Sequence, residues 1–485
     1  MKQEIVSSPK QARQHDFHGQ DSRNKSSVGF ATPTDKMGRW RHLAVEVSAT
    51  ARLALPIALT QLGQVAMTTT DLAFIGRIGA EALAAAALAS RVYLVSFAFG
   101  VGLLTAIAPF AAQAFGADNL AVARRSLRMG LWAALLLSLP IMGVALRGEQ
   151  ILRALGQTPE AAWLAQQYLF GLAWGAAPAL CFLTIRSFMS AVNRPEPVLW
   201  ITFAAIPVNG LLVYLLIYGE LGLPRLGLFG VGLATTTVNC TTFLAVLWFA
   251  TMRRPFSDYH VLAHLWRFDL PLMRQLIVIG MPISIAFLMT NGLFSAATLL
   301  AGLIGTDSLA AHQIALQIAT ILSMISFGIS TAAAVRVSHA VGRDDGPSIK
   351  RLGSVAILLG IVIASMLTLA VVAGRFEIAE LFLGDDGDAT SRLAAKLLLI
   401  SACFFITDAV QSIAAGSLRG LKDTRVPLLF ACIGYWLIGF SLSYVLGLKV
   451  GLGAIGIWIG LSIGTTVNAV LLLLRFQLLA NRFVL

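Results

Sequence analysis

Twelve long apolar runs constrain this chain more than any other feature of its sequence. The hydrocarbon core of a bilayer is about 30 Å thick, and a helix of about 20 residues crosses it. Backbone polar groups in lipid must be hydrogen-bonded within their own segment, so runs of this length are predicted to be helical. The runs cover residues 52–76, 84–115, 127–147, 162–191, 197–219, 226–251, 276–304, 309–338, 353–374, 394–419, 426–448 and 451–476. The sequence therefore predicts an all-α polytopic membrane protein.

The composition of the chain excludes a set of soluble domains. Of its 485 residues, 57% are hydrophobic and 12% are charged, whereas soluble proteins are about half apolar and about a quarter charged. The formal net charge is +12, but the basic residues lie in short gaps between apolar runs. This placement indicates membrane topology, and we expect no nucleic-acid partner. The four cysteines form no close pair, which predicts no disulfide framework.

The distribution of Lys and Arg predicts the orientation of the chain. Charges at the ends of the spans are counted with the adjoining loops, and the amino terminus is placed inside. The inside segments then hold 26 basic and 12 acidic residues, and the outside loops hold 8 basic and 10 acidic residues. Cytoplasmic loops carry the excess of positive charge. We therefore expect both termini to be cytoplasmic and the protein to be integral to the plasma (inner) membrane.

A repeat divides the apolar region into two halves. When the chain is shifted by 226 residues, 18 of the 70 positions from 56 to 125 are identical without a gap, where chance would give roughly one in ten. Each half holds six spans, so both halves have the same orientation and are related by an axis along the membrane normal. The prediction is twelve transmembrane helices in two six-helix lobes related by a pseudo-two-fold axis along the membrane normal. Two such lobes enclose a cleft and can alternate its access, which is typical of a transporter.

The predicted domains follow from these patterns. Residues 1–45 are polar and lack an apolar run, so a disordered cytoplasmic tail is expected there. The remaining predicted parts are an amino-terminal lobe (46–252), a cytoplasmic linker (253–275), a carboxy-terminal lobe (276–478) and a second cytoplasmic tail (479–485).

Several short motifs resemble the multidrug and toxic compound extrusion (MATE) family, NorM type. In the first half these are Thr70-Asp71-Leu72, Gly76, Gly79 and Leu83-Ala84-Ala85; in the second they are residues 309–315 and the loop 418–424 ahead of Pro427. The resemblance covers about residues 50–475. It implies export of amphipathic, often cationic, drug-like compounds coupled to H⁺ or Na⁺, with no cofactor, and a protein that is not an enzyme. We expect a monomer.

Two other classes compete with drug export. Related lipid-linked oligosaccharide flippases share the fold, but they should line the cleft with several basic residues to hold phosphate. Only Arg91 and Arg186 lie well inside the spans, which weighs against a flippase. A membrane-embedded enzyme is the second alternative. Neither a Gly-Lys-Ser/Thr phosphate loop nor a His-Glu-x-x-His motif is present.

Asp71 is the first candidate for the coupling site. An acid near the middle of a span costs about 2.5–3.5 kcal/mol on insertion scales, so its presence indicates a structural or functional return. Gln64 lies two helical turns earlier on the same face, and Asn209 lies in the fifth span. Their oxygens suit a hard cation such as Na⁺, or they can bond to a protonated acid. The resemblance assigns all three residues to the amino-lobe cation or proton site; helix locking by Asp71 is the alternative.

Asp408 is the second acid inside a span, and it matches an acid in the tenth span of the family. Here the sequence departs from the family pattern, because a Glu of the seventh span aligns with Thr290 and a Tyr of the tenth span aligns with Phe404. The carboxy-lobe site is thus reduced to one carboxylate. We therefore expect coupling to centre on Asp71, with sodium binding at Asp408 doubtful.

The same spans supply candidates for a substrate cleft that would suit flat amphipathic compounds. These candidates are Phe287, Met289, Thr290, Asn291, Phe404 and Arg91. Arg91 has two further interpretations: it pairs with Asp71, or its side chain reaches the outer interface.

Overall fold

The computed structural model describes residues 33–220, 222, 224–254, 266–383 and 388–483. Residues Met1–Ala44 and Val45–Leu485 form two compact units, and each is described by itself. In the first unit, helix α1 (Pro33–Ile78) already begins at Pro33, a residue that fits the first turn because no helical hydrogen bond needs its missing N–H. The predicted disorder of residues 33–45 is therefore wrong, and the prediction for residues 1–32 lies outside the described residues.

The second unit is built from long apolar helices, and no strand occurs among the described residues. Ten helices are long and apolar enough to cross a membrane, or twelve if each of two bent pairs is one span. The spans are Leu43–Ile78, Ala80–Gly116, Leu120–Leu146, Pro159–Ala191 (bent), Glu196–Tyr218, Gly227–Met252, Leu270–Ile304, Thr306–Gly342, Gly346–Ala373, Ala389–Gly420 (bent), Arg425–Lys449 and Ala454–Arg482. Each corresponds to one predicted run, which confirms the predicted fold class.

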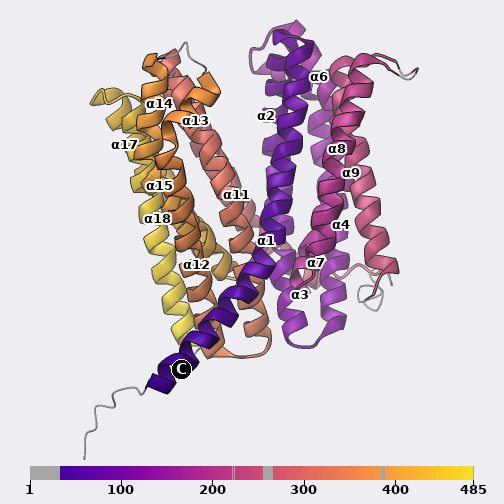
Figure 1. Cartoon of the computed structure of the whole chain (residues 1–485). Helices are drawn as coiled ribbons and strands as arrows, with labels where there is room; N and C mark the ends of the chain where they lie inside the picture. Colours follow the sequence, from indigo (N-terminus) through magenta and orange to yellow (C-terminus); the bar gives the residue numbers. More distant parts are fainter. Residues whose placement is uncertain (1–32, 221, 223, 255–265, 384–387, 484–485) are drawn as a thin grey trace, which may run out of the picture. The chain divides into compact units, whose positions relative to one another are not determined.

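The helices are labelled along the chain in Figure 1. The first half contains the rest of α1, then α2 (Ala80–Thr105), α3 (Ile107–Gly116), α4 (Leu120–Leu146), α5 (Gly148–Ala154), α6 (Pro159–Ala173), α7 (Ala176–Ala191), α8 (Glu196–Tyr218) and α9 (Gly227–Met252). The second half contains α10 (Leu270–Ile304), α11 (Thr306–Gly342), α12 (Gly346–Ala373), α13 (Arg375–Leu383), α14 (Asp388–Ile400), α15 (Ala402–Gly420), α16 (Arg425–Ala431), α17 (Ser441–Tyr444) and α18 (Ala454–Arg482). Two π-helical stretches, η2 (Cys432–Phe440) and η3 (Val445–Lys449), flank α17.

Three predicted boundaries differ from the structure. Helix α10 begins at Leu270, so the predicted linker 253–275 includes its first turns. Residues 255–265 of that linker lie outside the described residues. Helix α18 continues to Arg482, so residues 479–482 belong to the last helix and not to a separate tail.

The fourth span of each half is bent at the same place in the repeat. Helices α6 and α7 meet at 48°, and α14 and α15 meet at 43°. At the second bend the hydroxyl of Ser401 donates to the carbonyl of Leu397 at 2.7 Å. A hydroxyl that bonds back to its own helix competes with the backbone ladder and bends the helix. The apolar runs did not reveal either bend, because hydrophobicity does not change there.

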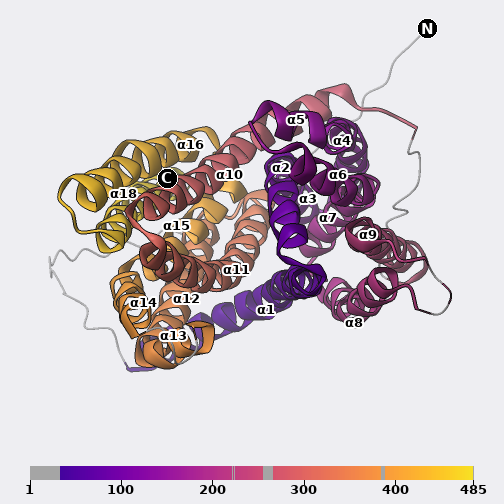
Figure 2. The same cartoon turned by 90° about the horizontal axis from the view of Figure 1, so that it is seen from above.

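The two halves form separate lobes that lie side by side (Figures 1 and 2). Across the boundary between them, α10 packs against α2 and α11 packs against α3. The two helix pairs correspond to each other in the repeat.

Single contacts at this boundary repeat with the same shift as the sequence. Gly102 of α2 lies against the backbone of Ser284 of α10, and Gly328 of α11 lies against Ala58 of α1. These two pairs are related by the shift of 226 residues, with each partner taken from the opposite lobe. Such reciprocity is the property of an interface with two-fold symmetry. The structure therefore contains the predicted pseudo-two-fold axis as a set of paired contacts.

A second reciprocal pair lies further along the same helices. Gly116 lies against His339, and Gly342 lies against Gln113. A side chain at either glycine would collide with the opposite backbone, so only glycine allows this approach. The Gln113 side chain also crosses the boundary and donates to the carbonyl of Gly420 at 2.8 Å.

The third span of each lobe begins with a side-chain cap in equivalent positions. Asn119 accepts from the backbone N–H of Val122 at 3.2 Å, and Asp345 accepts from that of Ser348 at 3.1 Å. Each cap satisfies a donor that the helix itself leaves unpaired. The hydrogen bonds from Ser348 hold the pKa of Asp345 below its ordinary value.

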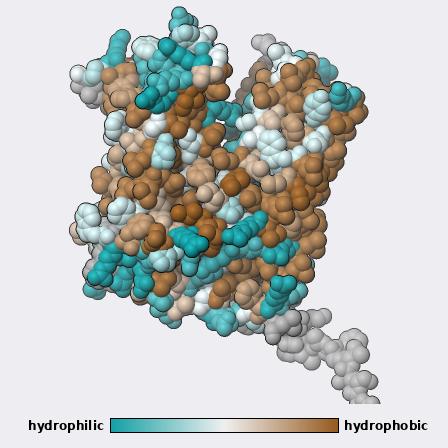
Figure 3. All heavy atoms as spheres, turned by 180° about the vertical axis from the view of Figure 1, so that it is seen from behind, coloured by the Kyte–Doolittle hydropathy of each residue, from teal (hydrophilic) through white to brown (hydrophobic). Residues whose placement is uncertain are grey.

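Polar contacts between the lobes gather at the end of the unit where α1 enters it and where α3 and α7 end. Arg336 of α11 forms an ion pair with Glu46 of α1 and also donates to the Thr50 hydroxyl. Nearer the middle, the Ser284 hydroxyl donates to the carbonyl of Phe99 at 2.7 Å. Figure 3 shows apolar side chains around the middle of one face, hydrophilic ones gathered at its ends, and a notch between the lobes at the opposite end. We call the joined end the closed end.

The close approach at Gly102 predicts a destabilised variant. Gly102→Ala places a Cβ into the backbone of Ser284, and overpacking of this kind costs about 1–3 kcal/mol. We expect a lower melting temperature of the purified protein in detergent. Gly143→Ala is the matched control, because no atom lies within 4 Å of the added Cβ. Equal melting temperatures for the two variants would contradict the packing described here.

Candidate functional site

Each lobe contains one cavity, and each cavity is lined by one of the two acids inside the spans. The amino-lobe cavity has a volume of about 290 Å³ and is lined by Asp71. The carboxy-lobe cavity has a volume of about 320 Å³ and is lined by Asp408. Both acids thus face a polar interior space of a lobe rather than lipid.

The carboxylate of Asp71 ties three helices of the amino lobe together. The side chain, on α1, belongs to a residue that is only 6% exposed. The amide of Asn209, on α8, donates to Oδ1 at 2.6 Å, and the hydroxyl of Thr235, on α9, donates to Oδ2 at 3.3 Å. Both donors are neutral, so the carboxylate has hydrogen bonds but no bonded cation. The structure therefore brings the predicted pair Asp71 and Asn209 into direct contact.

Gln64 lines the same cavity as Asp71, as its spacing predicts. Its side-chain oxygen, however, is 3.5 Å from Nη1 of Arg186, which donates at 2.7 Å to the side-chain oxygen of Gln61. Arg186 lies on α7 and reaches the cavity from the fourth span. Among the described residues, the structure records no ion pair between Arg186 and an acid. The cavity therefore contains an unpaired acid and an unpaired base, each held by neutral polar groups.

Arg186 and Thr235 are the parts of this site that the sequence did not indicate as site residues. Arg186 was visible as a charge inside a span, and that position was the available signal. Thr235 is one of several threonines in its span, and only the packing of α9 against α1 shows which of them meets Asp71.

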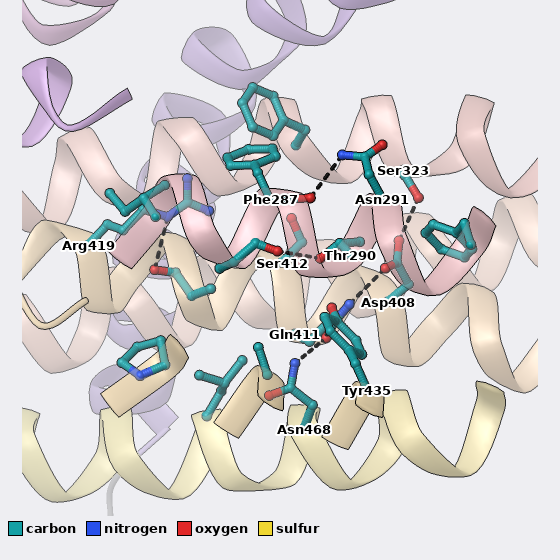
Figure 4. Close-up of a pocket in the computed structure, with 18 of the residues that line it drawn as sticks. Phe287, Thr290, Asn291, Ser323, Asp408, Gln411, Ser412, Arg419, Tyr435 and Asn468 are labelled. Atoms are coloured by element: carbon teal, nitrogen blue, oxygen red, sulfur yellow. Dashed lines mark hydrogen bonds between the residues drawn. The ribbon is translucent and has the colours of Figure 1, made fainter. Parts of the chain in front are cut away.

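The carboxylate of Asp408 is held in a similar way in the carboxy lobe (Figure 4). The Ser323 hydroxyl, on α11, donates to Oδ2 at 2.6 Å, and the Gln411 amide, one turn later on α15, donates to Oδ1 at 2.8 Å. The oxygen of Gln411 in turn accepts from the Tyr435 hydroxyl at 2.7 Å and from the Asn468 amide at 2.6 Å. A chain of hydrogen bonds thus joins Asp408 to η2 and α18.

The hydrogen bonds of Asp408 replace the features that are missing from the family pattern. The sequence predicted a site reduced to one carboxylate, because a Glu and a Tyr of the pattern are replaced. Tyr435 supplies a phenol to the same network from the eleventh span instead. The spacing of Gln411, three residues after Asp408, could have indicated this partner, since residues i and i+3 are neighbours on a helix.

The carboxy-lobe cavity also contains a guanidinium group. Arg419 lines it from the end of α15, and its nitrogens donate to Ser330 Oγ and to the carbonyl of Ala415, both at 3.3 Å. The two lobes therefore have equivalent contents, one acid and one arginine, although these residues occupy different positions in the repeat.

The predicted cleft residues divide into two groups. Phe287, Thr290 and Asn291 line the carboxy-lobe cavity (Figure 4). Met289 lies outside its lining and contacts the sulfur of Cys432 at 3.3 Å. Phe404 is fully buried and belongs to the hydrophobic core, where its ring meets that of Trp458 at a centroid distance of 5.4 Å.

Arg91 lies away from both cavities. Its side chain is exposed, and the bonded partners of Asp71 are Asn209 and Thr235. The interpretation of Arg91 as a partner of Asp71 is therefore wrong in this structure. An exposed guanidinium keeps its hydration, which a pair inside the lobe would remove.

The polar atoms of the amino-lobe cavity suit a proton or a hard cation. Carboxylate, hydroxyl and amide oxygens, as at Asp71, Thr235 and Asn209, are the ligands of such cations. Among the described residues, no group of three or more His, Cys, Asp or Glu side chains is placed to hold a metal ion. A transition-metal centre has therefore no ligand set in the described part of the chain.

Comparison with known proteins agrees with this architecture. The MatE family model matches residues 56–215 and 282–445, and the two segments begin 226 residues apart, as the repeat does. A protein of Bradyrhizobium diazoefficiens named "Probable multidrug resistance protein NorM" is 60% identical, over 91% of this chain and 96% of the relative. A protein of the same name from Rhodopseudomonas palustris is 51% identical, over 94% and 96%.

Solved structures have the same fold. A eukaryotic MATE transporter superposes with a TM-score of 0.81 at 18% identity, covering 91% of this chain and 98% of its own. A multidrug resistance MATE family transporter of the MOP superfamily, solved in an outward-facing conformation, superposes with a TM-score of 0.82 at 20% identity, covering 90% and 96%.

The separation of core from cavity predicts two different phenotypes for phenylalanine substitutions. Phe404→Ala should lower stability by about 3–5 kcal/mol, the usual cost of removing a buried aromatic ring. Phe287→Ala removes a cavity wall, so its melting temperature should change much less while its affinity for a transported dye changes. Thermal unfolding and dye binding in detergent measure both effects. A Phe404→Ala variant as stable as the Phe287→Ala variant would contradict this assignment.

Proposed function

Because this chain belongs to the MATE family and is a NorM-type transporter rather than an enzyme, we propose that it exports amphipathic, often cationic, compounds by antiport against H⁺ or Na⁺. The observation that carries the proposal is the buried carboxylate of Asp71, which lines a cavity and has only neutral hydrogen-bond partners. A charge in such surroundings is costly. The carboxylate therefore gains from an occupant, either a proton or a metal cation.

The three-helix arrangement links occupancy to conformation. An occupant at Asp71 competes for the oxygens that now accept from Asn209 and Thr235, so its arrival alters the bonds between α1, α8 and α9. A ligand shifts a conformational equilibrium only through such a difference in interactions between states. The ion thus changes the relative stability of the states between which the lobes move.

The carboxy-lobe cavity supplies a suitable surface for an amphipathic cation. Its wall includes Phe287, Thr290 and Asn291, and its single carboxylate is Asp408. Apolar walls with a few placed polar groups are typical of small-molecule sites. In this proposal Asp408 attracts the positive group of the substrate, and Asp71 carries the coupling ion.

The closed end of the lobes corresponds to the cytoplasmic side in the proposed topology. The starts of α1 and α10 and the ends of α3 and α7 lie there, and the positive-inside rule assigns these segments to the cytoplasm. The contacts of Glu46 with Arg336 would then seal the inner side, with the notch facing outward. The protein is accordingly proposed to reside in the inner membrane as a monomer, with both termini cytoplasmic.

A flippase for lipid-linked oligosaccharides is less well supported by the lining of the cavities. A phosphate-bearing substrate calls for several basic side chains. Each cavity instead pairs a single arginine, Arg186 or Arg419, with one acid. This balance favours small compounds with a positive group.

The role of Asp71 predicts a loss of coupling in the variant Asp71→Asn. Asparagine keeps the shape and can still accept a hydrogen bond, but it cannot take up a proton or balance a cation. Efflux of a cationic dye from everted vesicles, driven by an imposed gradient, should fall by about tenfold or more, within the usual range of coupling between sites. Glu81→Gln is the control, because this acid is exposed in the first turn of α2. Retained gradient-driven efflux in Asp71→Asn, at normal expression, would contradict the role.

The identity of the ion is separable by a second measurement in the same vesicles. If Na⁺ binds at Asp71, efflux at fixed pH should rise with an inward-directed Na⁺ gradient and saturate. If a proton binds there, a pH gradient alone should drive the same efflux in nominally Na⁺-free buffer. Wild-type efflux that responds to neither gradient would contradict antiport altogether.

A further inference from the structure

A third cavity lies at the closed end, between the two lobes. Its volume is about 470 Å³, larger than that of either cavity described above. Its walls come from the start of α1 and the loop between α7 and α8 in one lobe, and from the end of α11 and the start of α12 in the other. The proposed transport cycle does not use this space.

The lining of this cavity is strongly basic. It includes the guanidinium groups of Arg52, Arg194, Arg336 and Arg343, and a single acid, Glu196. Two of these arginines belong to the amino lobe and two to the carboxy lobe. The excess of positive charge is therefore divided between both sides of the boundary.

Two basic groups of the cavity are already engaged. Arg336 is paired with Glu46, which also lies 3.8 Å from Arg351. The ring of His339 is bonded to the carbonyl of Ala191 at 2.7 Å, which crosses the same boundary.

The other three arginines have free guanidinium groups. Arg52, Arg194 and Arg343 are exposed, and within the described ranges the structure records no ion pair between them and a carboxylate. They stand at the mouth of one cavity with donors to spare.

We propose that this cavity binds a phosphate group, with Arg194 from one lobe and Arg343 from the other as its principal ligands. The planar fork of arginine matches the oxygens of phosphate and often binds them with two parallel hydrogen bonds. The phosphate is carried either by an anionic lipid head group or by a soluble phosphate. Basic pockets between membrane helices on the cytoplasmic side are known to hold lipid head groups, and the cavity lies where membrane spans end.

Membrane topology alone accounts for basic residues in these loops, but not for their convergence. The positive-inside rule requires only that Lys and Arg lie somewhere in the short inner loops. Here segments from four different spans bring their arginines to one cavity, at a cost in mutual repulsion that an anion would remove.

A bound phosphate would hold the two lobes together at the closed end. It would add a bridge between Arg194 and Arg343 to the existing pair of Glu46 and Arg336. A ligand that contacts both lobes only when they are joined stabilises the joined state. The cavity is therefore a regulatory site, and its binding step is independent of ion coupling at Asp71.

Thermal unfolding of the full chain tests the proposal directly. The purified protein is compared in nanodiscs of phosphatidylcholine, in nanodiscs with 20% phosphatidylglycerol, and in phosphatidylcholine with millimolar inorganic phosphate. We expect the melting temperature to rise by several degrees in at least one of the two phosphate-bearing conditions. A rise with the lipid alone identifies a head group, and a rise with inorganic phosphate identifies a soluble ligand. No rise in either condition would overturn the proposal.

A matched pair of double variants separates the site from general surface charge. Arg194→Gln/Arg343→Gln should abolish the rise, since losing one charge-assisted contact weakens binding by about tenfold. Both residues are exposed, so the basal melting temperature should change little. Arg77→Gln/Arg147→Gln removes the same charge from exposed residues on the other side of the spans and should keep the rise.

Retention of positive charge supplies the last comparison. Arg194→Lys/Arg343→Lys should restore part of the rise, because lysine keeps the charge but loses the fork. A rise that is equal in the wild type, the glutamine variant and the control would show binding of phosphate to the surface at large, and this result would contradict the proposed cavity.

Discussion

A carboxylate inside a membrane-spanning lobe must be held by polar partners, and this requirement organises the functional half of the molecule. Asp71 satisfies it with hydrogen bonds from Asn209 and Thr235, which lie on two other helices. Neutral donors stabilise the carboxylate without fixing its charge, as a bonded arginine would. The acid can therefore exchange its occupant, and each exchange changes the interactions between helices. Both structure and proposed coupling follow from this single group.

The duplicated lobes supply the second constraint. Gly102 lies against Ser284 and Gly328 against Ala58, so the boundary is built from contacts that obey the internal repeat. A two-fold interface is self-complementary, and it allows two stiff lobes to rotate about one contact region. Glycine at these positions brings the backbones close without interlocking side chains. The ion pair of Glu46 with Arg336 then adds a polar link at the closed end.

Much of this architecture could be predicted from the sequence, because long apolar runs and a repeat are one-dimensional signals. The twelve spans, the two lobes and the pair of Asp71 with Asn209 are of this kind. Partners set by the rotation of one helix against another could not be predicted: Thr235 is one threonine among several in its span. Phe404 aligned with a polar family position yet lies in the core, since helix packing and not alignment decides which face is buried. The bends in the fourth spans leave no trace in hydrophobicity.

The distance between the lobes at their open end tests the central claim most directly. Ala80 and Thr306 are exposed, equivalent in the repeat, and begin α2 and α11. Spin labels at these two positions, in a background without the native cysteines, report the separation of the lobes in nanodiscs. We expect two populations whose ratio changes with pH or Na⁺ in the wild type and does not change in Asp71→Asn. A ratio that responds equally in both proteins would contradict the claim that occupancy of Asp71 drives the movement of the lobes.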